Sequence, residues 1–567
     1  FKDVTRSFAW IVEQPYNLVL AIISKGILKG QGQDATLILS PLSWVSIIGI
    51  FFTLALYTKD KFLIILVVFA IIYLAVFDQW QSSMITLSSI IIAVPIGVLL
   101  GILFGVLCYK SQLIEKIITP ILDLMQTVPV FAYLVPILVM FGFGPVSALI
   151  ATIIYAMPPM VRTTLLALNN IDPQLKESGI MSGCTDRQLM WKVLIPVSKP
   201  TLLIGVNQVI MLSLNMVIIA SMIGAGGLGY DVLASLRRLD IGGGIESGIA
   251  IVVLAIALDR LSQSFANLPT LTKKTRVSFY TKYKKIIFLL LYIIGVYLLG
   301  SFFSFFKFFP ENLMINTSAF WEDLVKYINI NYFDNLENFK ITLLTYFMLP
   351  IKRFFLGIPW PWFIIIITLI GWYFGKLKLA ALCFVLSVFI VTTGLWQKAM
   401  ITLYLCGSSV IIASLIGIPL GIWAGLNKKA DKILTAFIDT LQTLPSFVYL
   451  IPVVMLFRVG DFTAMIAVIL YALAPAVRYT AHGVKNINNQ IIEAALICGC
   501  SPRQLLFKIK LPLAIPEILL GINQTIMLAL SMLVITALVG TRDLGQEVYI
   551  GLTKADIGRG LIAGLCV

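Results

Sequence analysis

The stretch LDLMQTVPVFAYLVP at residues 122–136 recurs as IDTLQTLPSFVYLIP at residues 438–452. The two stretches lie 316 residues apart, and this offset holds without a gap over most of the chain. It pairs Trp44 with Trp360, Trp80 with Trp396, Glu177 with Glu493, Asn207 with Asn523, and Asp240 with Asp556. Self-similarity at a fixed offset predicts two copies of one structural unit in tandem.

The composition is that of a membrane protein. Of the 567 residues, 59% are hydrophobic and 12% are charged, and the mean hydropathy is +0.98. Soluble domains are about 45–50% apolar and about 25% charged. The net charge of +15 fits basic cytoplasmic loops and needs no nucleic-acid partner. We therefore predict an all-α, multi-pass protein of the cell (inner) membrane, with the lipid bilayer as its surroundings.

Catalytic and metal chemistry have few residues to draw on. The seven cysteines are scattered without a paired CxxC spacing, and His482 is the only histidine. A metal site or a histidine-based catalytic pair is therefore not expected. No Gly-x-x-x-x-Gly-Lys-Ser/Thr sequence occurs, so we expect the chain itself to bind no ATP. The sequence predicts a protein that is not an enzyme and holds no cofactor.

Apolar runs give the expected membrane segments, since a spanning helix needs roughly 20 residues. Copy one has runs near residues 42–57, 62–77, 84–108, 122–143, 146–161, 201–222 and 246–263. Copy two has runs near residues 360–374, 379–396, 400–426, 438–457, 462–477 and 517–540. The first two runs of each copy are short, and an interfacial or re-entrant placement stays open for them. The offset sets Val567 opposite Ile251, so we expect the sequence to stop inside the last helix of copy two.

A further apolar run at residues 286–306 lies between the copies. Seven spans reverse the side of the chain, and one linking span restores it, so the repeat is predicted to be parallel. We expect fourteen membrane segments and a pseudo-two-fold axis along the membrane normal. Basic residues precede the linking run and acidic residues follow it, which places the former in the cytoplasm and the latter outside.

The predicted domains follow from this arrangement. They are an N-terminal outer segment (1–40), copy one (41–265), a basic linker with its membrane helix (266–310), an outer segment (311–358) and copy two (359–567). Within the outer segments, residues 8–28 and 320–352 mix aromatic, aliphatic and charged side chains. Amphipathic surface helices are expected there, with a loop or a packing segment as the alternative.

A polar loop of about forty residues separates the fifth and sixth runs of each copy, longer than an ordinary connection. Gly183 and Gly499 suit the left-handed residue that ends a helix. Thr185 with Gln188, and Ser501 with Gln504, fit capping boxes that open a second helix. On spacing alone, a pair of surface helices held at the membrane by basic residues is as good an interpretation as a docking site.

The loop of copy two resembles the motif of permease subunits of ATP-binding-cassette importers. The motif is Glu493-Ala-Ala, a glycine six residues later, and Leu511-Pro512. Copy one departs from it with Glu177-Ser178-Gly179. Further stretches, GLWQKAM (394–400), GIPLGIW (417–423) and GINQTIMLALSM (521–532), are similar to the permeases of glycine betaine/proline importers. The resemblance covers roughly residues 44–265 and 360–567.

The resemblance implies a transport subunit with separate partners. It implies two cytoplasmic ATPase subunits, which carry ATP and magnesium, and an extracytoplasmic substrate-binding protein. Members usually pair as homodimers, so this fused chain is expected to supply both halves of the pore. The expected solute is glycine betaine or a related osmolyte, with proline, choline and trimethylamine N-oxide open. The residues expected to couple to the ATPase are Glu177, Gly183, Arg187, Trp191, Glu493, Gly499, Arg503 and Phe507.

Polar and aromatic residues inside the runs are candidates for the pore wall. They are Phe131, Tyr133, Asn207, Phe447, Tyr449 and Asn523. Aromatic faces suit a quaternary ammonium, while core packing or hydrogen bonding between helices explains the same residues equally well or better. An ion-coupled secondary transporter is the alternative, although the middles of the predicted core spans lack the ionisable residues that it would need. The coupling motifs argue against a third class, a membrane scaffold without transport.

The two loops are expected to differ in rigidity. Copy two has Ala494-Ala495 and Pro502, whereas copy one has Ser178-Gly179 and Asp186 at these positions. Glycine inside a helix costs about 1 kcal/mol relative to alanine. We therefore predict that the loop of copy two is the firmer one and carries more of the coupling.

Overall fold

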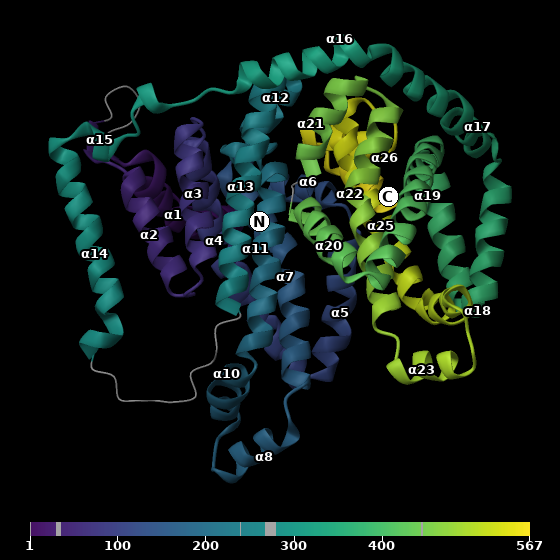
Figure 1. Cartoon of the computed structure of the whole chain (residues 1–567), viewed down its shortest axis with the longest axis horizontal. Helices are drawn as coiled ribbons and strands as arrows, with labels where there is room; N and C mark the ends of the chain where they lie inside the picture. The colour runs from purple at the N-terminus through teal and green to yellow at the C-terminus, as the bar shows by residue number, and fades with distance from the viewer. Residues whose placement is uncertain (1, 30–35, 239, 267–278, 444–445) are drawn as a thin grey trace. The chain divides into compact units, whose positions relative to one another are not determined.

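The computed structural model describes residues 2–29, 36–238, 240–266, 279–443 and 446–567 (Figure 1). Nearly all of the described residues are helical, as predicted. The only strands among them are β1 (Ile27–Lys29) and β2 (Thr36–Leu39), which pair in antiparallel fashion. They follow α1 (Lys2–Leu20) and the π-helix η1 (Ala21–Lys25).

Copy one is a series of apolar helices interrupted by the polar loop. The apolar part contains α2 (Trp44–Leu56), α3 (Lys61–Val76), α4 (Trp80–Lys110), α5 (Gln112–Thr127), α6 (Val130–Phe141), α7 (Pro145–Asn169), α11 (Lys199–Ser221), α12 (Leu228–Arg238) and α13 (Ile241–Ala266). The loop contains α8 (Pro173–Met181), α9 (Asp186–Gln188), η3 (Leu189–Leu194) and α10 (Ile195–Val197).

Copy two repeats this order after a connecting region. The connection holds α14 (Phe279–Phe302), α15 (Ser304–Lys307), η4 (Glu311–Leu313), α16 (Ser318–Leu343), η5 (Leu344–Met348) and α17 (Leu349–Gly357). The copy itself holds α18 (Trp360–Thr392), α19 (Trp396–Leu426), α20 (Lys428–Thr443), α21 (Ser446–Phe457), α22 (Asp461–Lys485), α23 (Asn489–Ile497), α24 (Pro502–Gln504), η6 (Leu505–Lys510), α25 (Leu511–Thr536), η7 (Ala537–Val539), α26 (Leu544–Thr553) and α27 (Ile557–Cys566).

Residues 122–143, predicted as one membrane segment, are divided between two helices, and whether the pair forms a single span stays a prediction. Helices α5 and α6 meet there at an angle of 103°. Pro129 lies at the break and explains it. Proline disfavours helical backbone in the residue before it and has no N–H to donate to the helix. In copy two, the runs 360–374 and 379–396 correspond to α18, whose backbone leaves the helical region at Gly375 and Lys376.

Eight described helices are long and apolar enough to cross a membrane, or nine if the bent pair α5–α6 counts as one span. Four shorter apolar helices occur at Trp44–Leu56, Lys61–Val76, Ile287–Gly300 and Ile557–Cys566. These include the first two segments of copy one, whose shortness the sequence indicated. The total of fourteen membrane segments stays a prediction.

The central helices of each copy pack through small residues at matching positions. A Cβ built on Gly101 of α4 would lie 2.5 Å from the Met160 Cβ of α7. The counterpart Gly417 of α19 stands in the same way against Ala476 of α22, at 2.6 Å. Gly105 and Gly421, one turn further on, make equally close contacts. Glycine lets these backbones approach, as is typical of membrane helices.

The chain divides into two compact units that do not coincide with the copies. Unit 1 contains residues 1–126 and 140–322, and unit 2 contains residues 127–139 and 323–567. Most of α6, which belongs to copy one by sequence, therefore packs within unit 2. How the two copies are related by an axis stays a prediction.

Helix α1 is a packing helix of unit 1. Its residues Val12, Tyr16 and Leu20 are buried against Ala93 of α4 and Leu149 of α7. Its opposite face exposes Trp10, Ile11 and Leu18. The amphipathic pattern of the N-terminal segment therefore reflects one face that packs on the bundle.

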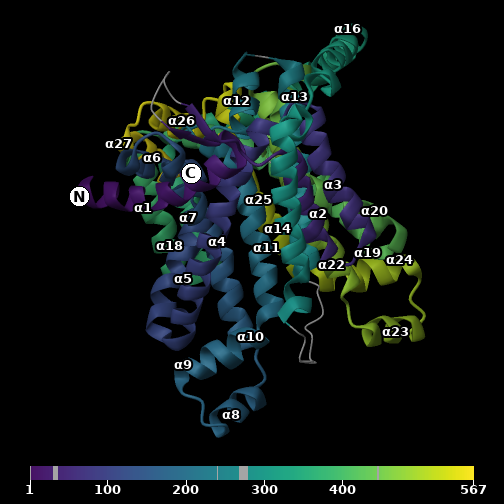
Figure 2. The same cartoon turned by 90° about the vertical axis from the view of Figure 1, so that its left-hand side faces the viewer.

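The polar loop and α12 lie at opposite ends of unit 1 (Figure 2). Helices α8 and α9 project beyond the lower ends of α7 and α11, while α12 lies at the upper end of the same helices. In unit 2, α23 and α26 are likewise at opposite ends of α25 (Figure 1). We call the end opposite the loop the outer end of each copy.

Candidate coupling loops, translocation path and outer ends

Both polar loops have the predicted helix, left-handed glycine and second helix. Gly183 has φ +75° and Gly499 has φ +80°. In copy one, the Gly183 N–H donates to the Ile180 carbonyl at 2.9 Å and the Cys184 N–H to the Gly179 carbonyl at 3.2 Å. Copy two repeats this pair of bonds from the N–H groups of Gly499 and Cys500. This is the Schellman pattern, in which glycine avoids the strain of a left-handed residue.

The predicted capping boxes are also confirmed. The Gln188 N–H donates to the Thr185 hydroxyl at 3.4 Å, and the Gln188 side chain accepts from the Thr185 N–H at 3.0 Å. Ser501 and Gln504 form the same reciprocal pair, at 3.4 and 2.8 Å. These bonds satisfy N–H groups that a helix start leaves without partners.

The predicted coupling residues are all exposed side chains or glycines of the loops. They are Glu177, Gly183, Arg187 and Trp191 in copy one, and Glu493, Gly499, Arg503 and Phe507 in copy two. Large apolar side chains are exposed beside them: Met181 is 89% exposed and Ile497 is 86% exposed. Apolar groups clustered on a polar loop are typical of a surface that another protein covers.

The second helices of the two loops pack differently. In copy one, Leu189, Met190 and Leu194 are buried against Val106 of α4 and Leu168 of α7. A Cβ on Gly179 would lie 2.6 Å from the Leu189 Cδ1, so the glycine makes room for this leucine. None of the residues of η6 in copy two is buried.

The candidate pore residues lie in different surroundings. The Phe131 ring is only 2% exposed and packs inside unit 2, whereas Tyr133 is partly buried. Asn207 is partly buried, and its Oδ1 has no hydrogen-bond partner among the described residues. Asn523 is exposed. The side chains of Phe447 and Tyr449 lie outside the described residues.

Two buried carboxylates lie on α13, where the sequence analysis considered only the middles of the spans. Glu246, near the start of the helix, accepts hydrogen bonds from the backbone N–H and the hydroxyl of Thr317, just before α16. Asp259 accepts from the Gln263 amide at 2.9 and 3.0 Å. Glu246 thus holds the start of α16 within unit 1.

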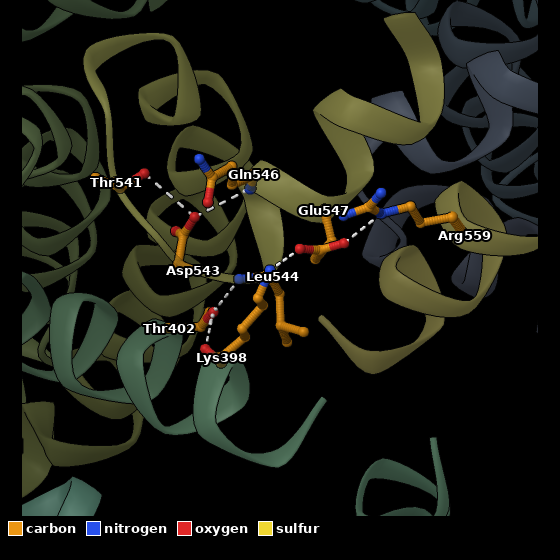
Figure 3. A network of polar contacts seen from close by, with 8 residues as sticks. All are labelled: Lys398, Thr402, Thr541, Asp543, Leu544, Gln546, Glu547 and Arg559. Carbon is orange, nitrogen blue, oxygen red and sulfur yellow. Dashed lines mark hydrogen bonds and ion pairs between the residues drawn. The ribbon is translucent and has the colours of Figure 1, made fainter. Parts of the chain in front are cut away.

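The outer end of copy two contains a charged cluster of two buried carboxylates and two partly exposed cations, which we define as Lys398, Asp543, Glu547 and Arg559 (Figure 3). Asp543 and Glu547 are 0% and 3% exposed. Glu547 of α26 forms ion pairs with Lys398 of α19 and with Arg559 of α27, whose Nε lies 2.5 Å from its Oε2. The carboxylate of Glu547 therefore connects three helices.

Asp543 caps the start of α26. Its Oδ1 accepts from the Gln546 N–H at 3.1 Å and from the Thr541 hydroxyl at 3.2 Å, and its Oδ2 has no partner among the described residues. Burial raises the pKa of this carboxyl from 3.8 to about 6, with these hydrogen bonds acting in the opposite direction. Desolvation disfavours the charged form and explains the direction.

Sequence patterns did not predict this cluster. The signal was present in the offset of 316 residues, which places Gly227 opposite Asp543 and Gly243 opposite Arg559. A comparison of charge between paired positions would have found both. That the four side chains meet could not be read from the sequence, since they come from three helices and a loop.

No group of three histidine, cysteine, aspartate or glutamate side chains that could hold a metal occurs in the described part of the chain. The seven cysteines are free thiols.

The family model of the binding-protein-dependent transport system inner membrane component matches residues 93–268 and 417–567. The trimethylamine N-oxide transport system permease protein of Pelagibacter ubique is 40% identical over 506 residues, which are 88% of this chain and 70% of that protein. Its counterpart from Ruegeria pomeroyi is 32% identical over 93% of this chain and 81% of that protein. The glycine betaine/proline betaine permease of Escherichia coli is 40% identical over 220 residues, 39% of this chain and 62% of that protein.

Proposed function

The chain belongs to the family of binding-protein-dependent transport system inner membrane components, and we propose that it forms the pore of an ATP-driven importer of a small methylated-amine solute. It is a multi-pass protein of the inner membrane and a transport subunit rather than an enzyme. The repeated coupling loops carry the proposal, because an ion-coupled carrier has no need of a second protein on its loops. The ATPase and binding-protein partners are part of the proposal.

We propose that one chain supplies both halves of the pore. Each copy has its own loop, with the same caps and the same left-handed glycine. Each also has the same small-residue contacts between its central helices. Two ATPase subunits, one on each loop, would hold the ATP and magnesium.

The loop surfaces support docking to those ATPase subunits. Met181 and Trp191 in copy one, and Ile497 and Phe507 in copy two, offer apolar contact area. Arg187 and Arg503, each in the short second helix, add a charge that suits an acidic partner. Exposed aromatic and arginine side chains are those that contribute most at protein interfaces.

For the solute we favour trimethylamine N-oxide over glycine betaine. The two trimethylamine N-oxide permeases match 88% and 93% of this chain, including the connection between the copies. The glycine betaine/proline betaine permease matches 39% of it. Both solutes carry methyl groups on nitrogen, which aromatic side chains such as Tyr133 bind through the ring face. With affinity located in a binding protein, the path itself needs only a few polar groups such as Asn207 and Asn523.

The test is reconstituted uptake. The chain, its ATPase and its binding protein are placed in vesicles that contain ATP, and labelled trimethylamine N-oxide is supplied outside. We expect uptake that needs both ATP and the binding protein and that persists when ion gradients are dissipated. Uptake driven by an ion gradient without ATP would favour the secondary transporter. Faster uptake of glycine betaine than of trimethylamine N-oxide would change the assigned solute but not the ATP-driven mechanism.

A further inference from the structure

The charged cluster of copy two is joined to α6 by a chain of direct contacts. Arg559, which pairs with Glu547, immediately precedes Gly560 in α27. A Cβ on Gly560 would lie 2.7 Å from the Val135 Cγ2 of α6, and one on Gly564 only 2.1 Å from the Ala132 Cβ. The backbone of α27 at Gly560 and Gly564 therefore packs directly against the side chains of α6. Neither glycine position has space for a larger residue.

Helix α6 is the one that carries Phe131 and Tyr133, the candidate aromatic residues of the path. Its position in unit 2 is set by what packs against it, and α27 is one such neighbour. Helix α26 in turn contacts α27 closely, since a Cβ on Gly551 would lie 2.6 Å from the Gly560 Cα. The ion pairs of Glu547 tie this pair of helices to the start of α19 (Figure 3).

Copy one indicates that the fold itself does not need these charges. The Leu228 N–H donates to the Thr86 hydroxyl at 3.0 Å, and the Leu544 N–H donates to the Thr402 hydroxyl at the same distance. Asp240 and Asp556 likewise cap the next helix in both copies. Yet copy one has serine, glycine, aspartate and glycine at the four cluster positions, Ser82, Gly227, Asp231 and Gly243.

Burying charge is a poor way to gain stability. The carboxylates of Asp543 and Glu547 lose their hydration at this site, while the side chains of Lys398 and Arg559 stay 33% and 38% exposed. Apolar residues often replace such buried carboxylates and their partners without loss. Copy one keeps only the carboxyl of Asp231 from this set of charges. The full set, which connects three helices beside α6, therefore needs a reason other than folding.

We propose that Glu547 is a positioning residue for transport, which through Lys398 and Arg559 holds α27 against α6 and so fixes the aromatic residues of the path on that side. The inference rests on the proposed function, since it assumes that α6 borders the path. Copy one has Asp231 in place of Glu547 and no cation at Gly243, so the two halves of the pore are not held equally.

The experiment uses the reconstituted complex with its ATPase and binding protein. Glu547→Gln keeps the shape of the side chain and removes its charge, and Asp231→Asn is the matched change in copy one. Per assembled complex, we expect Glu547→Gln to lower solute uptake at least tenfold and to raise the ATP hydrolysed per solute. Asp231→Asn should change either quantity less than twofold. Equal effects of Glu547→Gln and Asp231→Asn on uptake would overturn the inference. So would an unchanged number of ATP molecules hydrolysed per solute taken up in the Glu547→Gln variant.

A second readout separates positioning from general support of the fold. Val135→Cys with Gly560→Cys places two thiols across the contact between α27 and α6. In assembled complexes we expect oxidation to cross-link this pair several-fold more slowly when Glu547→Gln is added. A merely structural role would lower the amount of complex and leave the cross-linking rate of what remains unchanged.

A transplant covers the case in which Glu547→Gln fails to fold. Lys398→Ser, Asp543→Gly, Glu547→Asp and Arg559→Gly together give copy two the residues with which copy one already folds. This variant should assemble and take up solute at least tenfold more slowly than the unmodified chain. Uptake within twofold of the unmodified chain would refute the inference. Absence of ATP-driven uptake by the unmodified chain would instead refute the proposed function.

Discussion

The outer ends of the two copies share a backbone and differ in charge. Both start their short helix with a leucine N–H bonded to a threonine hydroxyl, and both cap the next helix with an aspartate. In place of Glu547, copy one has Asp231, whose pKa burial raises while a hydrogen bond with Ser82 lowers it. Copy two has the charged cluster, and nearby Lys352 pairs with Asp461 at 2.6 Å. The two copies therefore share the backbone hydrogen bonds of this end and differ in the charged side chains that connect its helices.

The polar loops of the two copies show the opposite contrast. Their caps and glycines are the same, yet copy one buries the second helix of its loop and copy two leaves it exposed. Each copy is therefore held more firmly at one end than its sister: copy two at the outer end, and copy one at the loop. The following experiments test this difference in order of expected effect.

The largest effect is expected at the buried leucine of the copy-one loop. Leu189→Ala removes a side chain that is 7% exposed, and such a change costs about 2–5 kcal/mol. Leu505→Ala, the same change at the partly exposed counterpart in copy two, should lower the stability of its loop by less. Hydrogen exchange of the backbone amides in each loop measures the difference. Equal acceleration of exchange in the two loops would show that their packing is equivalent.

The next effect concerns the contact between α27 and α6. Gly564→Ala places a methyl group 2.1 Å from the Ala132 Cβ, and overpacking of this kind costs about 1–3 kcal/mol. Gly407→Ala in α19 is the control, because no atom lies within 4 Å of the new methyl group. The melting temperature of the purified complex should fall for the first variant and hold or rise for the second. A fall of equal size in both would argue against a tight contact.

Smaller effects are expected from the left-handed glycines of the loops. A left-handed conformation costs an L-residue roughly 1–2 kcal/mol, and nothing within 4 Å of Gly183 or Gly499 adds a clash. The free-energy cost of the valine is therefore about the same in the two loops. A difference in solute uptake between the Gly183→Val and Gly499→Val variants then measures how much each loop contributes to coupling. The sequence predicts the greater loss at Gly499. The close packing of Leu189 on Gly179 compensates copy one, so a greater loss at Gly183 would show that packing outweighs helix propensity.

The smallest effect is a pH dependence that comes from the Asp543 carboxyl of copy two. The pKa of Asp543 is about 6 in the folded chain against 3.8 when unfolded, so the folded state binds the proton more tightly. Its contribution to stability is therefore greatest below pH 4 and is lost as the pH rises through 6. The groups that face it are Lys398 of α19, Asp461 of α22, the hydroxyl of Thr541 and the N–H of Gln546.

Asp543→Asn should remove that dependence. The variant stays neutral at every pH, so its melting temperature should gain on that of the unmodified chain as the pH rises from 4 to 7. Gly227, the copy-one counterpart, has no titratable group. Asp231→Asn is the matched change of a copy-one carboxyl whose pKa burial also raises, so it should shift the melting temperature with pH in the same direction. A constant difference in melting temperature across this range would mean that Asp543 does not titrate there.

Local features of this molecule could be predicted from its sequence because their causes are local. The capping boxes at Thr185 and Ser501 and the left-handed glycines depend on residues within six positions of each other, and all are confirmed. The internal repeat also predicted that the helices of copy two follow the same order as those of copy one. The bend between α5 and α6 was missed, although Pro129 stood in the middle of the predicted span.

Features made by distant residues could not be predicted in the same way. The cluster joins α19, α26 and α27, and the contact of α27 with α6 brings together residues more than 400 positions apart. Hydrophobic runs do not report which helix a segment packs against. The membership of residues 127–139 in unit 2 is therefore a result of the structure alone.

The central claim is that one fused chain, with two unequal copies, provides the whole pore. The most direct test is the native mass of the purified complex that takes up solute with ATP. We predict one copy of this chain together with two ATPase subunits. A complex with two copies of this chain would contradict the account, since each pore half would then come from a separate molecule.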